Sequence, residues 1–495
     1  MSAELILVCI AGYFSLLLLI AWYTGRNANE QGYFIGNKKS PWYAVAFGMI
    51  GDSLSGVTFI SVPGAVLLAH FGYMQLVFGY FFGYFVISEI LLPLYYRLNL
   101  TSIYTYLQQR FGNVSQKTGS FFFLLSRIAG AGARLFLAAG VMQMFVFDSF
   151  GIPFWLSVSI IIILILIYTY RGGIKTLVWT DAFQSSFLLL GVILSIVAIS
   201  SAMHFNFGDM ISAVRHSEHT ELFFWDWKLK SFFPKQFLGG MFIAITMSGL
   251  DQNMMQKNLS MEGSKYATRN MRTFAFIVVA VNLLFLALGA LLYIYAYSHN
   301  VSLPMNGEAV DTDKVFPFLA LERLGTFAGL VFIIGLTAAT FNSADSVLTA
   351  LTTSFYIDFL GMDKKENVNA KRKNNIRHII HVLFAVLLLF TILLFEMMNK
   401  QAIIDTVLKV ATYTYAPLLG IFAFGILTKR KTNETLVPFI CLVIPALCYL
   451  IDINSKEWFG GYQFGNEMLI LNGGLIFLAL LFTSGKQTDI LISHS

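Results

Sequence analysis

Apolar stretches long enough to cross a lipid bilayer recur along almost the whole of this chain. About 20 consecutive apolar residues in a helix span the hydrocarbon core. Only 12% of the 495 residues are charged, roughly half the share found in soluble domains. The sequence therefore predicts an all-α polytopic membrane protein with about thirteen transmembrane helices, near residues 4–24, 42–70, 74–96, 119–147, 153–170, 180–203, 233–256, 271–298, 324–358, 378–396, 403–427, 434–452 and 466–484.

Lysine and arginine cluster in loops on one side of these spans, including a loop with Lys257, Lys265 and Arg269. Cytoplasmic loops of membrane proteins carry this excess. We expect the N-terminus outside and the C-terminus in the cytoplasm, in a plasma membrane and, for a bacterium, the inner membrane. The net charge of +6 follows from this bias, so we expect a lipid bilayer and no nucleic acid as partner. The oligomeric state is not indicated.

The usual signatures of hydrolases do not occur in the sequence. It contains no Walker loop, no G-x-S-x-G and no H-E-x-x-H, each of which has a defined catalytic geometry. Its three cysteines, Cys9, Cys441 and Cys448, lie within apolar spans, so neither a disulfide framework nor a zinc site is indicated. We predict no enzyme activity and no catalytic residues.

One predicted span, over residues 331–349, changes from apolar to polar along its length. At 3.6 residues per turn its short polar side chains share a face with Asp345 at the edge. Hydroxyls alone are common packing contacts between membrane helices, but an acid at bilayer depth costs at least about 2.5–3.5 kcal/mol without a partner. Oxygen ligands suit hard cations, which predicts a cation such as Na⁺ beside the stripe formed by Ala339, Asn342, Ser343 and Ser346.

Two other spans contain glycines and polar residues in mid-membrane. The span over 42–70 includes Gly48, Gly51, Gly56 and Pro63, and the span over 233–256 has further glycines before an aspartate. Unwound backbone at this depth is tolerated only where it lines a cavity. Both spans are therefore predicted to be broken helices.

The two broken spans lie five spans apart, as the first helices of an inverted five-plus-five repeat would. We expect the chain to divide into a first span and cytoplasmic loop, a first repeat of spans 2–6, a second repeat of spans 7–11, and peripheral spans 12–13 with a cytoplasmic tail. The corresponding residues are 1–41, 42–203, 233–427 and 428–495.

Six motifs in order along some 400 residues resemble those of the sodium:solute symporter family. They are GYFIGNKKSPWYAVAFG, LLPLYYRLNLTSIYTYLQQRFG, YRGGIKTLVWTDAFQ, DQNMMQK, AATFNSADS and PLLGIFAFGILTKR. The resemblance covers about residues 32–430 and implies a leucine-transporter-type fold with two discontinuous helices. It also implies sodium coupling, with one or two Na⁺ ions.

The resemblance implies a principal sodium site between the first broken helix and the polar stripe. Carried over by motif, backbone carbonyls fall at Gly51, Leu54 and Ala339, and side chains at Asn342 and Ser343. Most relatives have a hydroxyl where Asn342 stands, but an amide oxygen is also a ligand for Na⁺. The alternative is that Asn342 only packs helices together.

In one branch of the family an acid in the WTD motif, here Asp181, contributes to a second sodium site. The stripe would supply Asn342, Ser343, Asp345 and Ser346. Two ionised carboxylates close together repel, so either a sodium ion lies between them or one is protonated. Alternatively, Asp181 starts a helix near the cytoplasmic surface as an N-cap.

For the solute, the resemblance points to Ser55 and Thr58 beside the first break and to Arg134 in the fourth span. A guanidinium at bilayer depth must be paired, and its fork matches a carboxylate. The spacing of Arg134 to WTD resembles that of the carboxylate-binding arginine of sialic-acid carriers. The alternative is an internal salt bridge of Arg134 to Glu89 or Asp52.

Three other residues near these positions have less definite expectations. Arg127 is expected to lie at the cytoplasmic side of its helix. Tyr413 and Tyr415 either line the cavity or pack.

These features together predict a sodium-coupled secondary active symporter that imports a small organic solute by alternating access. A carboxylate such as sialic acid or a related sugar acid is the favoured solute, because of Arg134. A neutral sugar or polyol is the alternative. A sodium-permeable channel or a sensor is less favoured.

Overall fold

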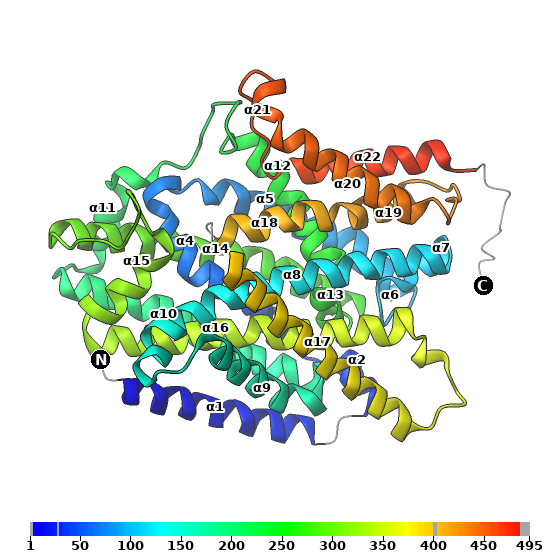
Figure 1. The fold of residues 1–495 in the computed structure, drawn as a ribbon, viewed down its shortest axis with the longest axis horizontal. Helices are drawn as coiled ribbons and strands as arrows, with labels where there is room; N and C mark the ends of the chain where they lie inside the picture. The colour runs from blue at the N-terminus through cyan, green and yellow to red at the C-terminus, as the bar shows by residue number, and fades with distance from the viewer. Residues whose placement is uncertain (1–2, 27–28, 399–402, 486–495) are drawn as a thin grey trace.

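The computed structural model describes residues 3–26, 29–398 and 403–485. Figure 1 shows the long helices running in broadly the same direction, so that most loops gather at two opposite ends. Within the described residues the only strands are β1 (Met305–Asn306) and β2 (Ala309–Val310), paired antiparallel in one loop. The predicted all-α architecture is therefore confirmed.

In the first half of the chain the helices are α1 (Ala3–Gly25), α2 (Glu30–Ile35), α3 (Trp42–Ser53), α4 (Gly56–Ala69), α5 (Tyr73–Val86), α6 (Leu92–Arg97), α7 (Thr105–Arg110), α8 (Asn113–Phe145), α9 (Phe154–Gly172), α10 (Ile174–Ala202) and α11 (Phe207–Arg215). Short 3-10 or π-helical segments are η1 (Gly36–Lys38), η2 (Ile87–Leu91), η3 (Phe147–Phe150) and η4 (Glu218–Thr220).

In the second half they are α12 (Phe233–Ala244), α13 (Gln252–Asn258), α14 (Ser264–Ser298), α15 (Thr312–Phe318), α16 (Gly325–Ser354), α17 (Ala370–Met398), α18 (Ile403–Thr414), α19 (Ala416–Leu427), α20 (Val437–Ile453), α21 (Ser455–Trp458) and α22 (Met468–Thr483). The short segments are η5 (Ile245–Gly249), η6 (Leu319–Arg323), η7 (Phe355–Phe359) and η8 (Met362–Lys364).

Every predicted span coincides with a helix or a run of helical segments. Among the described residues, seven helices are long and apolar enough to cross a membrane, and α3 with α4 forms an eighth, bent span. Shorter apolar helices occupy four of the other positions, and α12, η5 and α13 occupy the predicted span 233–256. The multi-pass membrane protein is confirmed, whereas the total of thirteen and the repeat boundaries stay predictions. The predicted tail beyond residue 485 lies outside the described residues.

The first predicted break lies between α3 and α4, which are bent by 58° relative to each other. Leu54 (φ −108°, ψ 72°) and Ser55 (φ −70°, ψ 179°) are not helical there. Gly48 and Gly51, which we expected to unwind the span, lie within α3 instead. A side chain at Gly51 would approach Asn342 of α16 to 2.5 Å, so this glycine permits close packing rather than the bend.

The second predicted break follows α12. A π-helical turn, η5, leads to Leu250 and to Asp251 (φ −114°, ψ 124°), after which α13 begins. The Asp251 carboxylate accepts a hydrogen bond from the backbone N–H of Met254 at 3.2 Å and caps the new helix,. Both discontinuous helices are therefore present where the sequence predicts them.

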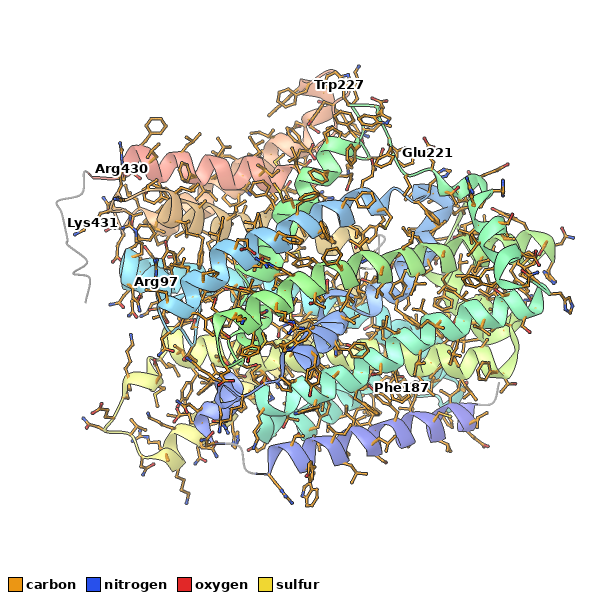
Figure 2. All side chains as sticks on the ribbon, turned by 180° about the vertical axis from the view of Figure 1, so that it is seen from behind. Arg97, Phe187, Glu221, Trp227, Arg430 and Lys431 are labelled. Carbon is orange, nitrogen blue, oxygen red and sulfur yellow. The ribbon has the colours of Figure 1, made fainter. Side chains whose placement is uncertain are left out.

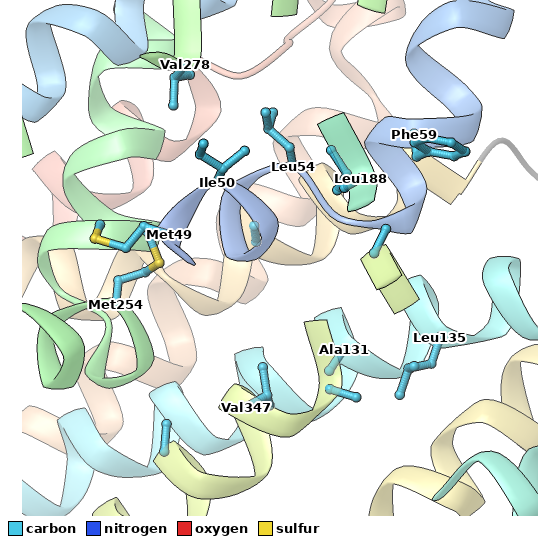
Figure 3. Packing of buried hydrophobic residues seen from close by; sticks show 14 of the residues in the cluster. Met49, Ile50, Leu54, Phe59, Ala131, Leu135, Leu188, Met254, Val278 and Val347 are labelled. Carbon is cyan, nitrogen blue, oxygen red and sulfur yellow. The ribbon is translucent and has the colours of Figure 1, made fainter. Parts of the chain in front are cut away.

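The apolar core surrounds these breaks. Figure 3 shows Ile50 and Leu54 beside the break, with Met49 of α3 facing Met254 of α13. The side chains of Ile50 and Leu54 are almost completely buried. α16 packs along α10, and its residues from Gly335 to Ser354 are all buried. The polar stripe therefore faces protein rather than lipid.

Several basic loops meet at one end of the molecule. Arg110 donates hydrogen bonds to the carbonyl oxygens of Thr428 (2.9 Å) and Arg430 (3.0 Å), and Lys364 donates to Gln108 at 2.7 Å. Figure 2 shows Arg97, Arg430 and Lys431 at this same end. These basic loops thus lie together in space, as loops on one side of a membrane would,.

Candidate functional site

The polar stripe of α16 lies against α3 just before the break. Asn342 is completely buried, and its amide nitrogen donates to the backbone carbonyl of Asp181 at 3.4 Å. Its Oδ1 has no hydrogen-bond partner among the described residues. A buried acceptor without a donor is costly, and a cation ligated by Oδ1 would remove this cost. The amide at position 342 therefore fits a sodium ligand set.

The other predicted members of the principal site lie in the same two elements. Gly51 contacts Asn342 across the interface between α3 and α16, and Leu54 is in the break itself. The Ser343 hydroxyl donates to the carbonyl of Ala339 at 2.9 Å. The structure thus brings α3 and the stripe together at the predicted position.

Asp181 lies in the eighth position of α10 and has no exposed surface. The alternative of an N-cap is therefore wrong, because α10 already begins at Ile174. Its Oδ2 accepts from the Ser346 hydroxyl at 3.3 Å and lies 2.5 Å from the ammonium of Lys257. Its Oδ1 has no partner among the described residues, so this oxygen also fits a cation ligand.

Asp345 is held by donors on its own side of α16. The Tyr168 hydroxyl donates to its Oδ2 at 2.8 Å, and the backbone N–H of Ser346 donates to its Oδ1 at 2.5 Å. Both carboxylate oxygens thus have protein partners. Asp181, with an unpartnered oxygen, has more ligand capacity left than Asp345.

The buried base beside these acids is Lys257, which the sequence predicts to lie in a cytoplasmic loop. That expectation is wrong. Lys257 lies in α13 and is 1% exposed, and it forms ion pairs with both Asp52 and Asp181. A signal was available in the sequence, because acids buried in a membrane need cationic partners and DQNMMQK supplies a lysine directly after the second break.

A central cavity of about 80 Å³ lies beside the first break. Ser55, Thr58 and Arg134 all line it, together with Tyr73 and Tyr80. The three predicted solute residues, from α8 and the start of α4, are therefore brought together around one space. Hydroxyls and a guanidinium on one cavity wall can bind a polar anion.

Arg134 forms no ion pair with any carboxylate of the described chain. The two acids considered as its partners are bound elsewhere, because Glu89 pairs with Arg272 at 2.7 Å and Asp52 pairs with Lys257. The alternative of an internal salt bridge to either acid is therefore wrong. Its guanidinium remains available to a solute.

Arg127, two turns earlier in α8, is buried. Its Nε lies 2.5 Å from Asp251 Oδ2, and its NH2 donates to the Met247 carbonyl at 3.2 Å. The Tyr415 hydroxyl also donates to Asp251 Oδ2, at 2.7 Å. This cluster joins α8 to the second break, and it shows that Tyr415 has a specific partner.

A larger cavity of about 650 Å³, here called the vestibule, adjoins the central cavity at Tyr73, which lines both. Its volume lies within the usual range for ligand pockets. Its polar lining includes His70, Gln75, Lys230, Gln236, Lys409 and Asn466. The vestibule and the central cavity therefore share a wall at Tyr73.

Broken helices at the level of a cavity, with buried charges and unpartnered oxygens beside it, define a secondary active membrane carrier. The sequence profile of the sodium:solute symporter family matches residues 33–435. This match spans well over half of the chain, which therefore belongs to the sodium:solute symporter family. It is a sodium-coupled transporter of a small solute and not an enzyme.

Among characterised relatives, the chain is 24% identical over 488 residues to the sodium/sialic acid symporter SiaT of Proteus mirabilis, covering 97% of this chain and 95% of that protein. It is 24% identical over 478 residues to the sodium/sialic acid symporter NanT of Aliivibrio fischeri, covering 94% and 91%. Sodium-coupled monocarboxylate transporter 2 of Danio rerio is 25% identical over 415 residues, covering 81% and 64%.

Two solved structures share the fold. One is a Na⁺-coupled sialic acid symporter in a substrate-bound outward-open state, with a TM-score of 0.82, 20% identity and 97% of both chains covered. The other is Mhp1, a nucleobase-cation-symport-1 family transporter, with a TM-score of 0.58, 13% identity, and 92% of this chain and 94% of that one covered. The predicted leucine-transporter-type fold is confirmed.

Proposed function

We propose that this symporter imports a small organic carboxylate, such as sialic acid or a related sugar acid, together with Na⁺. The observation that carries the proposal is the guanidinium of Arg134, which lines the central cavity without an acid partner in the described chain. Such a group at bilayer depth needs a counter-charge. A solute carboxylate supplies one and matches the fork in two parallel hydrogen bonds.

Ser55 and Thr58, which line the same cavity beside the break, would bind polar groups of the solute. The names of the two sialic acid symporters support a sugar acid as the solute class. A neutral sugar or polyol would leave Arg134 without a counter-charge, which makes it the less favoured solute.

The principal sodium ion would bind to carbonyls of Gly51, Leu54 and Ala339 and to the side chains of Asn342 and Ser343. The unpartnered Oδ1 of Asn342 supports this assignment. A second ion would bind at Asp181 with Asn342, Ser343, Asp345 and Ser346. The unpartnered Oδ1 of Asp181 supports it, whereas Asp345 is the weakest member because both its oxygens already accept hydrogen bonds.

A second sodium ion would change what the carrier can accumulate. One Na⁺ supplies about 3.7 kcal/mol from a tenfold gradient and 100 mV, and a monoanion returns about 2.3 kcal/mol of this. One ion thus supports about tenfold accumulation, and two support roughly 5,000-fold. A carrier of a carboxylate therefore gains most of its concentrating power from the site at Asp181.

The basic loops that meet at one end would face the cytoplasm,. The N-terminus would then lie outside and the C-terminus inside, and in a bacterium the membrane would be the inner one. The division into repeats at residues 42–203 and 233–427 belongs to the same proposal, since both broken helices open their predicted repeat.

The proposal is tested by uptake of labelled N-acetylneuraminate into proteoliposomes with an inward gradient of NaCl or of choline chloride. Accumulation above equilibrium only with sodium supports it. Equal uptake in choline contradicts sodium coupling for this solute. Competition by neutral sugars but not by sugar acids contradicts the proposal that the solute is a carboxylate.

The principal sodium site has its own matched pair of variants. Ser343→Ala removes a proposed ligand hydroxyl. Thr337→Ala removes a buried hydroxyl of the same helix, which donates to the backbone carbonyl of Ile333 at 2.7 Å. We expect loss of sodium-stimulated uptake in Ser343→Ala and normal sodium dependence in Thr337→Ala. An unchanged sodium dependence in Ser343→Ala contradicts the site.

A further inference from the structure

Lys257 occupies a position that neither the uptake mechanism nor the proposed ligands use. Its ammonium lies among three elements: its own helix α13, α3 with Asp52, and α10 with Asp181. The side chains of all three residues are at most 2% exposed. Two carboxyl groups and one amine are thus confined to a water-poor space, where charges act on one another strongly.

The two carboxylate oxygens of Asp181 differ in whether they have protein partners. Oδ2 is taken, because it contacts Lys257 and accepts from the Ser346 hydroxyl. Oδ1 is buried and has no partner among the described residues. Lys257 therefore does not fill the capacity of Asp181 for ligands. A sodium ion on Oδ1 would share the carboxylate with the ammonium.

The cluster of Asp52, Asp181 and Lys257 carries a formal charge of −1, the sum of two carboxylates and one ammonium. Asn253 donates to the other oxygen of Asp52 at 3.2 Å, which keeps Asp52 oriented toward Lys257. A cation entering at Oδ1 is attracted by both acids and repelled by Lys257. The ammonium therefore sets how much of the acids' attraction the cation experiences.

We infer that Lys257 lowers the affinity of the sodium ion at Asp181, so that this ion is released after transport instead of being retained. The inference rests on the proposed second sodium site. Two carboxylates without a base would hold a buried cation tightly, and differences in affinity among related sites lie mostly in the dissociation rate. Lys257 is in this sense a positioning residue that acts through Asp181.

Two single variants change the charge of the cluster and the double variant restores it, and all three leave Asp181 in place. Lys257→Met makes the formal charge −2, Asp52→Asn makes it 0, and the double variant returns it to −1. We expect half-saturating sodium to fall about tenfold in Lys257→Met and to rise about tenfold in Asp52→Asn, each tenfold step being 1.4 kcal/mol. The double variant should lie near the wild type.

The measurements are sodium dependence of uptake at saturating solute, and sodium-dependent thermal stabilisation of the purified protein, which needs no transport. Turnover should fall in Lys257→Met, because the ion leaves more slowly. A purely structural lysine would weaken sodium binding in both single variants. A fall of half-saturating sodium in Lys257→Met together with a rise in Asp52→Asn is expected only from the charge effect. If Lys257→Met does not fold, Asp52→Asn and the double variant still carry the test.

Asp181→Asn separates this inference from the second sodium site itself. If Asp181→Asn leaves the sodium dependence and its cooperativity unchanged, the second site is wrong and the inference falls with it. If Asp181→Asn raises half-saturating sodium while the charge variants all match the wild type, the site stands and the role of Lys257 is overturned.

Discussion

Arg127 and Arg134 are the same residue type on the same face of α8, two helical turns apart, but their surroundings differ completely. Arg127 is paired with Asp251 at 2.5 Å, next to a carboxylate that Tyr415 also binds. Arg134 lines the central cavity and has no acid partner in the described residues. An intramembrane arginine is thus structural where the protein supplies the acid, and available to a solute where it does not.

The largest effect is expected from Arg127→Met. It leaves Asp251 buried without its base, which costs about 3–5 kcal/mol, and it uncouples α8 from the second break. We expect a large fall in the unfolding temperature of the purified protein and uptake reduced more than about 100-fold.

The double variant Arg127→Met with Asp251→Asn tests the reason for this loss. Removing both charges leaves no unpaired ion, so the thermal stability should largely return. If the double variant is as unstable as the single one, the ion pair is not the cause.

Arg134→Lys should reverse this pattern. A point charge cannot replace the two parallel hydrogen bonds of the guanidinium, so KM for an acidic solute should rise about 10- to 100-fold. Because Arg134 forms no ion pair with an acid of the described chain, its substitution leaves no buried carboxylate unpaired. The unfolding temperature without solute should therefore stay close to that of the wild type. An unchanged KM would show that the two arginines do not differ as the structure suggests.

A smaller effect is expected when the solute is changed instead of the protein. The methyl ester of the solute lacks the anionic carboxylate and should compete more weakly than the acid against the wild type. In Arg134→Gln this preference should shrink, with a coupling energy of about 1–2 kcal/mol between the two changes. Competition assays with the acid and the ester on the wild type and on Arg134→Gln measure this coupling energy. If the two losses of affinity simply add, Arg134 does not contact the solute carboxylate.

The smallest effect is expected from Tyr415→Phe. It removes one of the hydrogen bonds to Asp251 Oδ2 but leaves the Arg127 ion pair in place, so stability should fall by about 1 kcal/mol with little change in KM. Tyr104→Phe is the matched control, since the Tyr104 hydroxyl donates at 3.0 Å to the neutral carbonyl of Leu250. A larger loss in the control would remove the special role of Asp251.

Some of the site could be predicted because its signals are local. The face shared by Asn342 and Ser343 follows from helical periodicity alone, and the break near Ser55 follows from glycines and polar residues within an apolar run. The role of the glycines could be predicted only in part. Gly51 serves the contact with Asn342, a partner that lies far away in the sequence.

The misplaced residues share one property, which is that their environment is set by a distant segment. Lys257 looked like a loop residue because it follows the span, but the chain re-enters a helix after the second break and takes the lysine into the core. The alternative that makes Asp181 an N-cap fails for the same reason, since α10 begins at Ile174, before the predicted apolar run.

The sequence by itself determined that this chain is a many-span membrane protein of the symporter family, where its helices break, and which stripe is rich in oxygen ligands. These properties depend on the hydropathy and spacing of neighbouring residues, because the bilayer constrains the length of each span and the places where a helix can break. Only the tertiary structure decided which buried charges are paired: Lys257 with Asp52 and Asp181, Arg127 with Asp251, and Arg134 with no acid of the described chain. A buried charge requires a partner, but the sequence does not specify which one, because the partners lie on different helices far apart in the chain: Lys257 and Asp52 are 205 residues apart, and Arg127 and Asp251 are 124 residues apart.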